Sequence, residues 1–538
     1  MGSAMAKRLS VSWIVLHWAA ILLVLLSLGS GFRIAILDKP WLLWLSPILP
    51  QGALHWLHVA SGCGLTVIAL FYVMRQVLKK NNRPSGERTF IQVYHRLVTW
   101  FGYVVVLVAV ITGWLFALDR QGWVPYPDLH FLAALGMAAY ILLHGGGYFI
   151  QFGYPVIKRI VLPDHNRWGL NGLIIVFGLA AALAVWSNID LASGNVLTVS
   201  RIPMDTFIDI DGSPDEAAWQ KAEAFTVLTH GGANFGDGTT PVHIKALENG
   251  VEAFFHISWR DPTRSLKHLP LIKTAQGWRV QQNGFYRFDE TDYYEDKLAV
   301  MLSDECQYGG AGTAHLGPRP LPNQPANWHG KGYHYAEDGK VRDIWHWKAV
   351  RTNNMFLADD NFFGAPVQAR AGERRYKAGY VTDSKTSGAY VMNWRWYTQD
   401  RVIPKRLPET PEAIAPYQSP ADKVPDSGDA SALSWVIPWF DYNAHQAEED
   451  RFPPGTVMPS VLYRSNRFEG DRADVRARGV WEDGSWSLEL SRRLITGSEH
   501  DVPIDDGICL WVSAFDQSQV AHTRHQRGIV LSFEGADD

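Results

Sequence analysis

The chain has 538 residues, 47% of them hydrophobic, and a formal net charge of −4. This length is too great for one ordinary domain, and a small net charge without a basic block argues against a nucleic-acid partner. The three cysteines (Cys63, Cys306 and Cys509) are too few for a disulfide scaffold, and no C-x-x-C-H motif is present to attach a c-type haem.

Hydrophobicity divides the chain in two, because the apolar runs are concentrated before about residue 190. Five segments are long and uncharged enough to cross a bilayer: roughly 10–30, 53–78, 97–118, 129–151 and 170–189. We therefore predict a membrane α-helical bundle. Its first four helices belong to a domain at 1–165, and a fifth transmembrane helix lies in a linker region at 166–195.

Basic residues are concentrated on one side of this predicted bundle. Lys7 and Arg8 precede the first segment, and the loops after the second and fourth segments are also basic. The loops 31–52 and 119–128 are poor in lysine and arginine. Because basic loops stay in the cytoplasm, we expect a bacterial inner-membrane protein with a cytoplasmic N-terminus. Everything after about residue 190 would then lie in the periplasm.

Histidines recur at matched depths in the predicted helices. His130 and His144 are fourteen positions apart, which is nearly four turns of a helix, so both face the same way near opposite membrane surfaces. His17 lies at the depth of His144, and His55 and His58 lie at the depth of His130. Ionisable groups inside a membrane are costly, and neutral imidazole is a standard axial haem ligand. The pattern favours two stacked haems over four separate structural histidines.

Residues 10–150 resemble the bacterial four-helix dihaem cytochrome b family, which includes membrane subunits of formate dehydrogenase and hydrogenase. The resemblance implies two haems with ligands from the first, second and fourth helices. It assigns the iron ligands to these histidines: His17, His58, His130 and His144.

The second helix offers two candidate ligands. The stretch HVASG places Gly62 one turn after His58, where a small residue lets a porphyrin approach, so His58 is preferred and His55 is the alternative. At the start of the third helix, His95 and Arg96 are candidates for the vicinity of a quinone. An interfacial histidine among basic residues explains His95 equally well.

After the fifth segment, the sequence changes to alternating apolar residues, glycine and proline turns, and many aromatic residues. VHIKALENGVEAFFHISWRD places two period-two runs around Asn249-Gly250, and VWEDGSWSLELSRRL repeats this pattern around Asp483-Gly484. We predict an all-β sandwich at 196–538, interrupted at about 352–430 by an insert that faces a partner or shields a haem. In an oxidising compartment, Cys306 and Cys509 are candidates for a disulfide.

Most of residues 205–533 resemble the haem-binding subunit of ethylbenzene dehydrogenase, through DIDGSPDEAAWQKA, YYEDKLAVML, VRDIWHWKAV and WVSAFD. The resemblance implies a b haem held between a methionine before W-x-W-K-A and a lysine after the WVSAFD-like strand. In this chain, His334 stands near the methionine position, and His522 and His525 stand near the lysine position.

These replacements predict a bis-histidine haem site formed by His334 and His525, with His522 as the alternative second ligand. For the first ligand, His329 and Met301 are the alternatives. The opposing explanation is that these are loop histidines in a domain without haem.

Together the two parts predict a membrane-bound electron-transfer cytochrome with three b haems. It would pass electrons between the quinone pool and a periplasmic cytochrome c or molybdoenzyme. Other membrane subunits are further candidate partners. No nucleophile or molybdenum site is evident, so the only chemistry expected is quinol oxidation or quinone reduction. Two alternatives stay open: a membrane-anchored sensory or ligand-binding protein, which needs no depth-matched histidines, and a quinol-dependent metal reductase.

Overall fold

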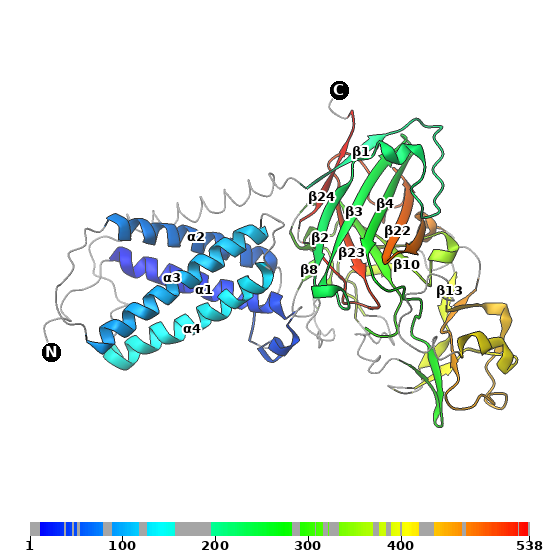
Figure 1. Cartoon of the computed structure of the whole chain (residues 1–538), viewed down its shortest axis with the longest axis horizontal. Coiled ribbons are helices and arrows are strands. Elements are labelled where there is room, and N and C mark those ends of the chain that lie inside the picture. Colours follow the sequence, from blue (N-terminus) through cyan, green and yellow to red (C-terminus); the bar gives the residue numbers. More distant parts are fainter. Residues whose placement is uncertain are drawn as a thin grey trace. The chain divides into compact units, whose positions relative to one another are not determined.

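The structure is a computed structural model. It describes residues 11–36, 39–45, 48–50, 54–78, 89–117, 126–155, 195–281, 291–306, 308–315, 333–369, 376–382, 389–396, 401–418, 435–464, 470–525 and 527–535, together with the single positions 321 and 398. The chain forms two compact units, a helical unit at 1–194 and a β unit that begins at 195 (Figure 1). The predicted fifth membrane helix at 170–189 lies outside the described residues.

The described part of the helical unit contains four long helices. They are α1 (Val11–Ala35), α2 (Leu54–Leu78), α3 (Phe90–Ala117) and α4 (Tyr126–Phe152), with a short 3-10 helix, η1 (Pro40–Leu45), after α1. All four are long and apolar enough to cross a membrane, as predicted. Helix α1 packs mainly on α2, and α3 packs mainly on α4. Large apolar side chains such as Leu107 and Leu142 are exposed on the protein alone, as expected for contact with lipid.

The β unit is built around one twelve-stranded sheet. Its order is β12 (Tyr380–Thr382), β11 (Asp359–Phe363), β10 (Arg342–Lys348), β7 (Lys297–Ser303), β23 (Cys509–Phe515), β24 (Ile529–Phe533), β1 (Val196–Arg201), β3 (Thr239–Glu248), β4 (Glu252–Arg260), β22 (Ser485–Arg493) and β21 (Arg476–Glu482), with β2 (Phe225–His230) also paired to β3. Strand β1 pairs in parallel with both β24 and β3, and the other neighbours in this sheet are antiparallel.

Smaller sheets and short helices complete the described β unit. One sheet joins β13 (Tyr390–Met392), β20 (Val461–Tyr463) and β17 (Val436–Pro438), and another joins β14 (Trp394–Trp396), β15 (Val402–Pro404), β6 (Gly277–Val280), β5 (Leu271–Thr274) and β19 (Val457–Met458). Two pairs are β16 (Arg406–Pro408) with β18 (Tyr442–Ala444), and β8 (Ala314–His315) with β9 (Tyr333–His334). The helices are α7 (Tyr308–Ala311), η2 (Ala217–Gln220), η3 (Gly236–Gly238), η5 (Asn353–Met355), η6 (Pro411–Tyr417), η8 (Trp439–Asp441) and η9 (Asp471–Ala473).

Both predicted hairpins are confirmed. Strands β3 and β4 pair around Asn249-Gly250, and strands β21 and β22 pair around Asp483-Gly484. Asp483 and Gly484 have φ values of 48° and 75°. Two consecutive positive φ values are typical of the type I′ turn, whose twist matches that of the flanking strands.

The large sheet curls over on itself, so its two halves enclose one core. Strands β4 and β10 are far apart in the sheet order, yet Phe255 packs against Trp345 with ring centroids 5.7 Å apart, and Trp259 packs against Trp347 at 6.0 Å. Gly479 on β21 makes room for this packing, because a Cβ there would lie 2.5 Å from the Trp347 ring. The predicted sandwich is thus formed by a single curved sheet.

Strands occur within the expected insert at 352–430. Strands β11 and β12 belong to the large sheet, whereas β13 to β16 form smaller sheets. A second apolar core combines part of this region with distant segments, for example Leu407 with Trp278 and Leu462. Cys306 and Cys509 form a disulfide, with their Cα atoms 5.5 Å apart.

Candidate functional site

Two histidines face each other inside the helical unit. The imidazole rings of His58 on α2 and His130 on α4 lie edge to face, with centroids 5.9 Å apart and planes at 89°. Two imidazoles that share one metal ion, with bonds of about 2 Å each, have centroids roughly 6 Å apart. The ring that faces His130 is therefore spaced for a shared metal, and it belongs to His58 rather than to His55 one turn earlier.

Hydrogen bonds orient the His58 ring. Its Nδ1 lies 3.0 Å from the carbonyl oxygen of Ser27 and 3.1 Å from the hydroxyl of Ser30 on α1. Because a carbonyl oxygen can only accept, Nδ1 carries the proton and donates it to Ser27. The lone pair is then on Nε2, and a ring in this tautomer can bind a metal through Nε2.

The His130 ring is oriented in the same way. The Thr112 hydroxyl on α3 donates to the carbonyl oxygen of Val108 at 2.6 Å, so it is left to accept from His130 Nδ1 at 2.9 Å. This arrangement again leaves the lone pair on Nε2. Both facing rings are thus held in the ligating tautomer by polar groups of a neighbouring helix.

Glycines near this pair of histidines show where the helices pack tightly on the rings and where space remains. A Cβ at Gly31 would lie 2.9 Å from His58 Cε1, and a Cβ at Gly113 would lie 3.1 Å from His130 Cε1, so both helices pack directly on the rings. At Gly62, one turn after His58, a Cβ would meet nothing within 4 Å. The space beside His58 is therefore open, and the residues fit a flat cofactor with two axial imidazoles.

A second group of histidines lies further along α4. His144 interacts electrostatically with His17 of α1 and with His95 of α3. Its ring stacks on Tyr140 with centroids 5.1 Å apart, and Tyr148 packs against it at the same separation. The structure thus brings His17 and His144 into one region, as their matched depths predict.

The two candidates for a quinone vicinity differ in their surroundings. The ring of His95 lies 4.2 Å from that of Tyr148, and its Nε2 lies 2.7 Å from Gln151 Oε1 on α4. The neighbouring Arg96 side chain is exposed. Only His95 is therefore part of the aromatic cluster beside His144.

In the β unit, one face of four adjacent strands carries a further set of candidates. Trp345 and Trp347 on β10 point into the main core, so Ile344 and His346 point to the opposite side. We call this side of β11, β10, β7 and β23 the distal face. Its apolar part contains Met301, Ile344, Trp511, Cys509 and Ala311.

His346 is a candidate that the sequence interpretation missed. The register places it opposite Asp359 on β11 and Ala299 on β7, and Ala299 is opposite Ser513 on β23, so small side chains lie on its β7 and β23 side. Its Nε2 is buried without a hydrogen-bond partner among the described residues. Burial, and then the charges of Lys348 and Lys297, hold the pKa of His346 well below its ordinary value. It is therefore a neutral imidazole with an unused nitrogen.

The predicted pair of His334 and His525 is not assembled in the structure. His334 stacks on Phe363 with centroids 4.9 Å apart. His525 accepts from the Val512 N–H at Nε2, 3.0 Å, and donates from Nδ1 to the Arg527 carbonyl, 2.7 Å. Main-chain groups thus engage both nitrogens of His525, and neither is left for iron.

The alternative His522 lies at the other end of the distal face. It packs against Phe515 with centroids 4.9 Å apart and donates from Nδ1 to the Thr523 carbonyl, 2.7 Å, which puts the lone pair on Nε2. Phe363 pairs with Arg342, whereas Phe515 pairs through Lys297 with Lys348, six positions further along β10. Six strand residues span roughly 20 Å, so His334 and His522 do not approach one iron.

Phe515 contacts both His346 and His522. The His346 ring packs against Phe515 with centroids 5.4 Å apart, and the two histidines interact electrostatically. Met301, an alternative ligand, is buried in the apolar part of the distal face, and His329 lies outside the described residues.

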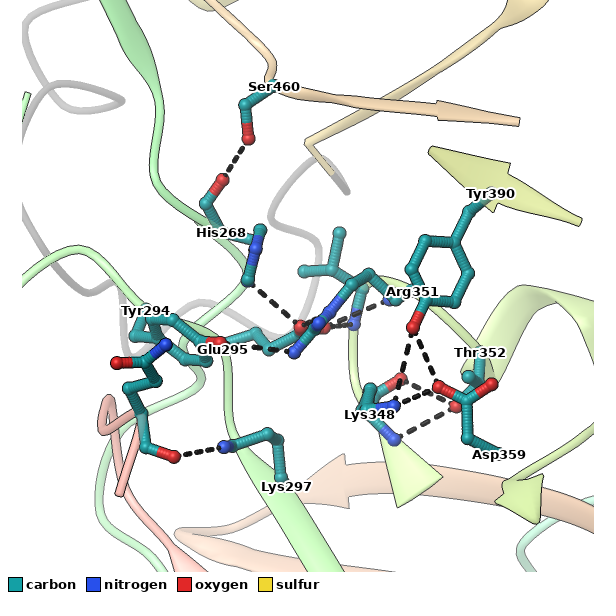
Figure 2. A network of polar contacts seen from close by, with 12 residues as sticks. His268, Tyr294, Glu295, Lys297, Lys348, Arg351, Thr352, Asp359, Tyr390 and Ser460 are labelled. Carbon is teal, nitrogen blue, oxygen red and sulfur yellow. Dashed lines mark hydrogen bonds and ion pairs between the residues drawn. The ribbon is translucent and has the colours of Figure 1, made fainter. Parts of the chain in front are cut away.

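A buried network of charged side chains lies at the Lys348 end of the distal face (Figure 2). Lys348 forms an ion pair with Asp359, which also accepts from the Tyr390 hydroxyl at 2.7 Å and from Arg472 Nε at 2.7 Å. Burial raises the pKa of Asp359, but Lys348 and Arg472 outweigh it and bring the value to about 2. Burial lowers the pKa of Lys348 to about 8 against the opposing effect of Asp359. The network ties β10, β11 and β13 together.

Glu295 forms the second centre of this network. It forms an ion pair with Arg351 and accepts from the Val350 N–H at 2.6 Å, while His268 Nδ1 lies 3.1 Å away (Figure 2). Burial, and then the Arg351 charge, bring the pKa of His268 to about 4, so at neutral pH its imidazole is neutral. These contacts make this region a structural support, with its charged groups paired.

Comparison with known families identifies both units. A family model described as ethylbenzene dehydrogenase matches residues 216–527, which is more than half of the chain. The chain belongs to the ethylbenzene dehydrogenase family. A second model, described as prokaryotic cytochrome b561, matches residues 8–161, which contain the four described membrane helices of this ethylbenzene dehydrogenase family member. Both predicted resemblances are confirmed, and they support membrane electron transfer by haem b.

Other comparisons add little. No curated protein matches the chain. A solved structure described as a carbohydrate-binding protein from Bacteroides uniformis is 10% identical, covers 64% of this chain and 100% of its own, and superposes with a TM-score of 0.25. That score is too low to transfer fold or ligand to this member of the ethylbenzene dehydrogenase family.

Proposed function

We propose that this protein is a membrane-bound electron-transfer cytochrome with three b haems, which connects quinol in the membrane to a soluble redox partner. The observation that carries the proposal is the facing pair His58 and His130, each held with its Nε2 lone pair available to a metal. Bound haem iron supplies one-electron transfer, and the protein sets its potential through ligands, burial and nearby charge.

The helical unit would hold two of the haems. We assign one to His58 and His130, and the other to His17 and His144. The electrostatic interaction between His17 and His144 and the aromatic rings stacked beside His144 support the second assignment. Two sites on one helix would give electrons a path across the membrane.

The distal face of the β unit would hold the third haem. Membership of the ethylbenzene dehydrogenase family supports a haem in this unit. His346 offers a buried nitrogen without a partner among the described residues, and His522 approaches the same phenylalanine. We therefore assign His346 and His522 in place of the expected His334 and His525.

We infer the direction of insertion from the basic loops, and the partners from the proposed electron-transfer role. Basic loops favour a cytoplasmic N-terminus, which would put the β unit in the periplasm. The described disulfide, Cys306–Cys509, suits that oxidising compartment. A periplasmic cytochrome c or a molybdoenzyme would then exchange electrons with the β unit, and quinol would meet the helical unit.

A pyridine haemochrome assay on the purified full chain tests the proposal. We expect three b haems per chain, all reducible by a quinol. Two haems would restrict the function to the helical unit and make the β unit a docking module. A folded chain without haem, after expression with ample haem supply, would favour the sensory alternative. Steady reduction of ferric or cupric complexes by quinol would instead identify a metal reductase.

A further inference from the structure

Four basic side chains gather around Trp439 in the β unit. The guanidinium of Arg406 lies 4.0 Å from the centre of the Trp439 ring, and that of Arg464 lies 5.4 Å from it. Lys405 precedes Arg406 and interacts electrostatically with Arg395 on β14 and with Arg464. We call these side chains and the adjacent phenylalanine the Trp439 surface: Arg395, Lys405, Arg406, Arg464, Trp439 and Phe440. Segments that are distant in the sequence thus bring four positive charges to one place.

This positive charge is not balanced within the described part of the chain. None of the four basic side chains forms an ion pair with an aspartate or a glutamate among the described residues. Burial lowers the pKa of Lys405, and the charges of Arg395 and Arg464 lower it further. Like charges held close together without a neutralising group cost free energy, so an anionic partner would stabilise this arrangement.

Apolar side chains accompany the charges of the Trp439 surface. Phe440 directly follows Trp439 and is 84% exposed, and Ile403 is 38% exposed. Ile403 lies opposite Arg395 in the pairing of β15 with β14, so both side chains are on the same face. Aromatic residues and arginine are enriched in protein–protein interfaces, and three of the four basic residues here are arginines. The Trp439 surface therefore has the composition of a site that binds a protein.

The Trp439 surface adjoins the Lys348 end of the distal face. Strand β20 leads into this surface and ends at Tyr463, whose hydroxyl donates to the Val350 carbonyl at 2.7 Å. Tyr463 lies opposite Tyr390 of β13, and the Tyr390 hydroxyl is 3.4 Å from Lys348 Nζ. Lys348 is two positions from His346, the buried imidazole that we assign to the third haem. A protein bound to the Trp439 surface would therefore lie at the haem end of the β unit.

The chain enters the β unit at the opposite end of these strands. Val196 begins β1 and is aligned with Ser303 of β7 through the intervening strands β24 and β23. Lys297, which pairs with Lys348, is six positions from Ser303 along β7, a distance of roughly 20 Å. The segment from the helical unit thus joins the end of the strands that is remote from the Trp439 surface. This position favours a soluble protein over a lipid surface as the occupant.

We propose that the Trp439 surface is the docking surface for an acidic soluble protein that exchanges single electrons with the haem of the β unit. The inference rests on the proposed function and adds the charge of the partner and the place where it binds. One electron passes at a time: when the reduced partner loses it, a ferric haem gains it and becomes ferrous. Opposite charges speed the encounter of the two proteins, and apolar contacts slow their dissociation.

Binding of a plant-type ferredoxin, an acidic one-electron carrier, tests this proposal. The full chain is held with its haems in nanodiscs of neutral phosphatidylcholine, and surface plasmon resonance measures both rate constants. We expect Arg395→Glu and Arg464→Glu each to lower the association rate constant roughly 10-fold at low salt. This difference should disappear at about 1 M salt, where the Debye length is about 3 Å. Lys221→Glu reverses an exposed charge beside β1 and should bind as wild type.

The apolar part of the surface is tested separately by Phe440→Ala. Because this side chain is 84% exposed, its removal should leave the urea midpoint and the haem content unchanged. We expect the ferredoxin to dissociate roughly 10-fold faster from this variant, while its association rate stays that of wild type. Stopped-flow haem reduction by pre-reduced ferredoxin should slow in each variant in parallel with binding.

The outcomes separate this proposal from the proposed function. Wild-type binding in both arginine variants, or no binding of ferredoxin to wild type at low salt, would overturn the docking surface and leave the proposed function intact. Equal binding of a lysine-rich cytochrome c would overturn the acidic partner. Loss of binding to phosphatidylglycerol vesicles in the arginine variants, with ferredoxin binding retained, would identify a lipid-binding surface instead. A count of two haems per chain, with ferredoxin binding as expected, would overturn the third haem of the proposed function and the electron exchange, but not the docking.

Discussion

The imidazoles of His58 and His130 lie edge to face, 5.9 Å apart, although they belong to different helices. We expect His58→Ala and His130→Ala each to lose one haem per chain by pyridine haemochrome assay, because one imidazole cannot replace two axial ligands. His55→Ala is the matched control on the same helix and should keep every haem. Loss of haem in His55→Ala, with retention in His58→Ala, would reverse the assignment.

The hydroxyl of Thr112 orients one of these rings. Thr112→Val keeps the shape of the side chain but removes the acceptor that lies 2.9 Å from His130 Nδ1. Groups that orient a metal-bound histidine typically contribute 10–100-fold to affinity or activity, so we expect faster loss of one haem to a haem scavenger and a shifted midpoint potential. Thr112→Ser keeps the hydroxyl and should behave as wild type. Unchanged potentials in Thr112→Val would show that the hydroxyl has no part in haem binding.

The helical unit could be predicted from the sequence because helix geometry is fixed. A rise of about 1.5 Å and a turn of about 100° per residue convert the spacing of His130 and His144 into depth and direction without further information. The preference for His58 over His55 rests on Gly62, the small residue one turn after His58, and it is His58 that faces His130. The hydrogen bonds that His58 and His130 donate to Ser27 and Thr112 could not be predicted, because they depend on how the helices rotate against one another.

The distal face could not be predicted, because it depends on long-range strand pairing. Strand β23 pairs with β7, and β7 pairs with β10, across loops and the insert. A shift of one residue in such a register would turn His346 into the core. The sequence signal for His346 is the alternation of tryptophans around it in VRDIWHWKAV, which puts the histidine on the face opposite the core.

Close packing between β21 and β10 makes Gly479 a sensitive position. A Cβ there would lie 2.5 Å from the Trp347 ring, so Gly479→Ala must displace a buried indole. Overpacking of this kind typically costs 1–3 kcal/mol, so we expect a lower urea midpoint. Tryptophan fluorescence of the full chain in detergent measures the unfolding. Gly236→Ala is the control, because its Cβ would meet nothing within 4 Å. Equal midpoints for the two variants would contradict the curled arrangement of the sheet.

The ion pair of Lys348 and Asp359 predicts a dependence of stability on pH. The pKa of Asp359 is about 2 in the folded protein, below its ordinary 3.8, so its contribution is complete above about pH 4 and is lost as the pH falls through 2. A shift of this size corresponds to about 2 kcal/mol in the free energy of unfolding. Urea unfolding between pH 5 and pH 2 measures it.

Asp359→Asn should remove this acid-sensitive step. It should also destabilise the β unit at pH 7 by about 3–5 kcal/mol, because Lys348 and Arg472 would keep buried charges without their partner. Asp215→Asn, at an exposed position, should change neither quantity. A wild-type acid profile in Asp359→Asn would assign the pH dependence to another carboxylate.

The four histidine candidates for haem binding in the β unit differ in their contacts. His525 is engaged at both nitrogens by the main chain of Val512 and Arg527, so His525→Ala should lower stability by about 1–3 kcal/mol while the haem count is unchanged. His346→Ala and His522→Ala should each remove one haem and leave the two membrane haems intact, since their side chains lie on the distal face. His334→Ala, at the far end of that face, should keep all three. Haem loss in His334→Ala and His525→Ala, with retention in His346→Ala, would require the β unit to rearrange around its haem and would restore the pair expected from the family pattern.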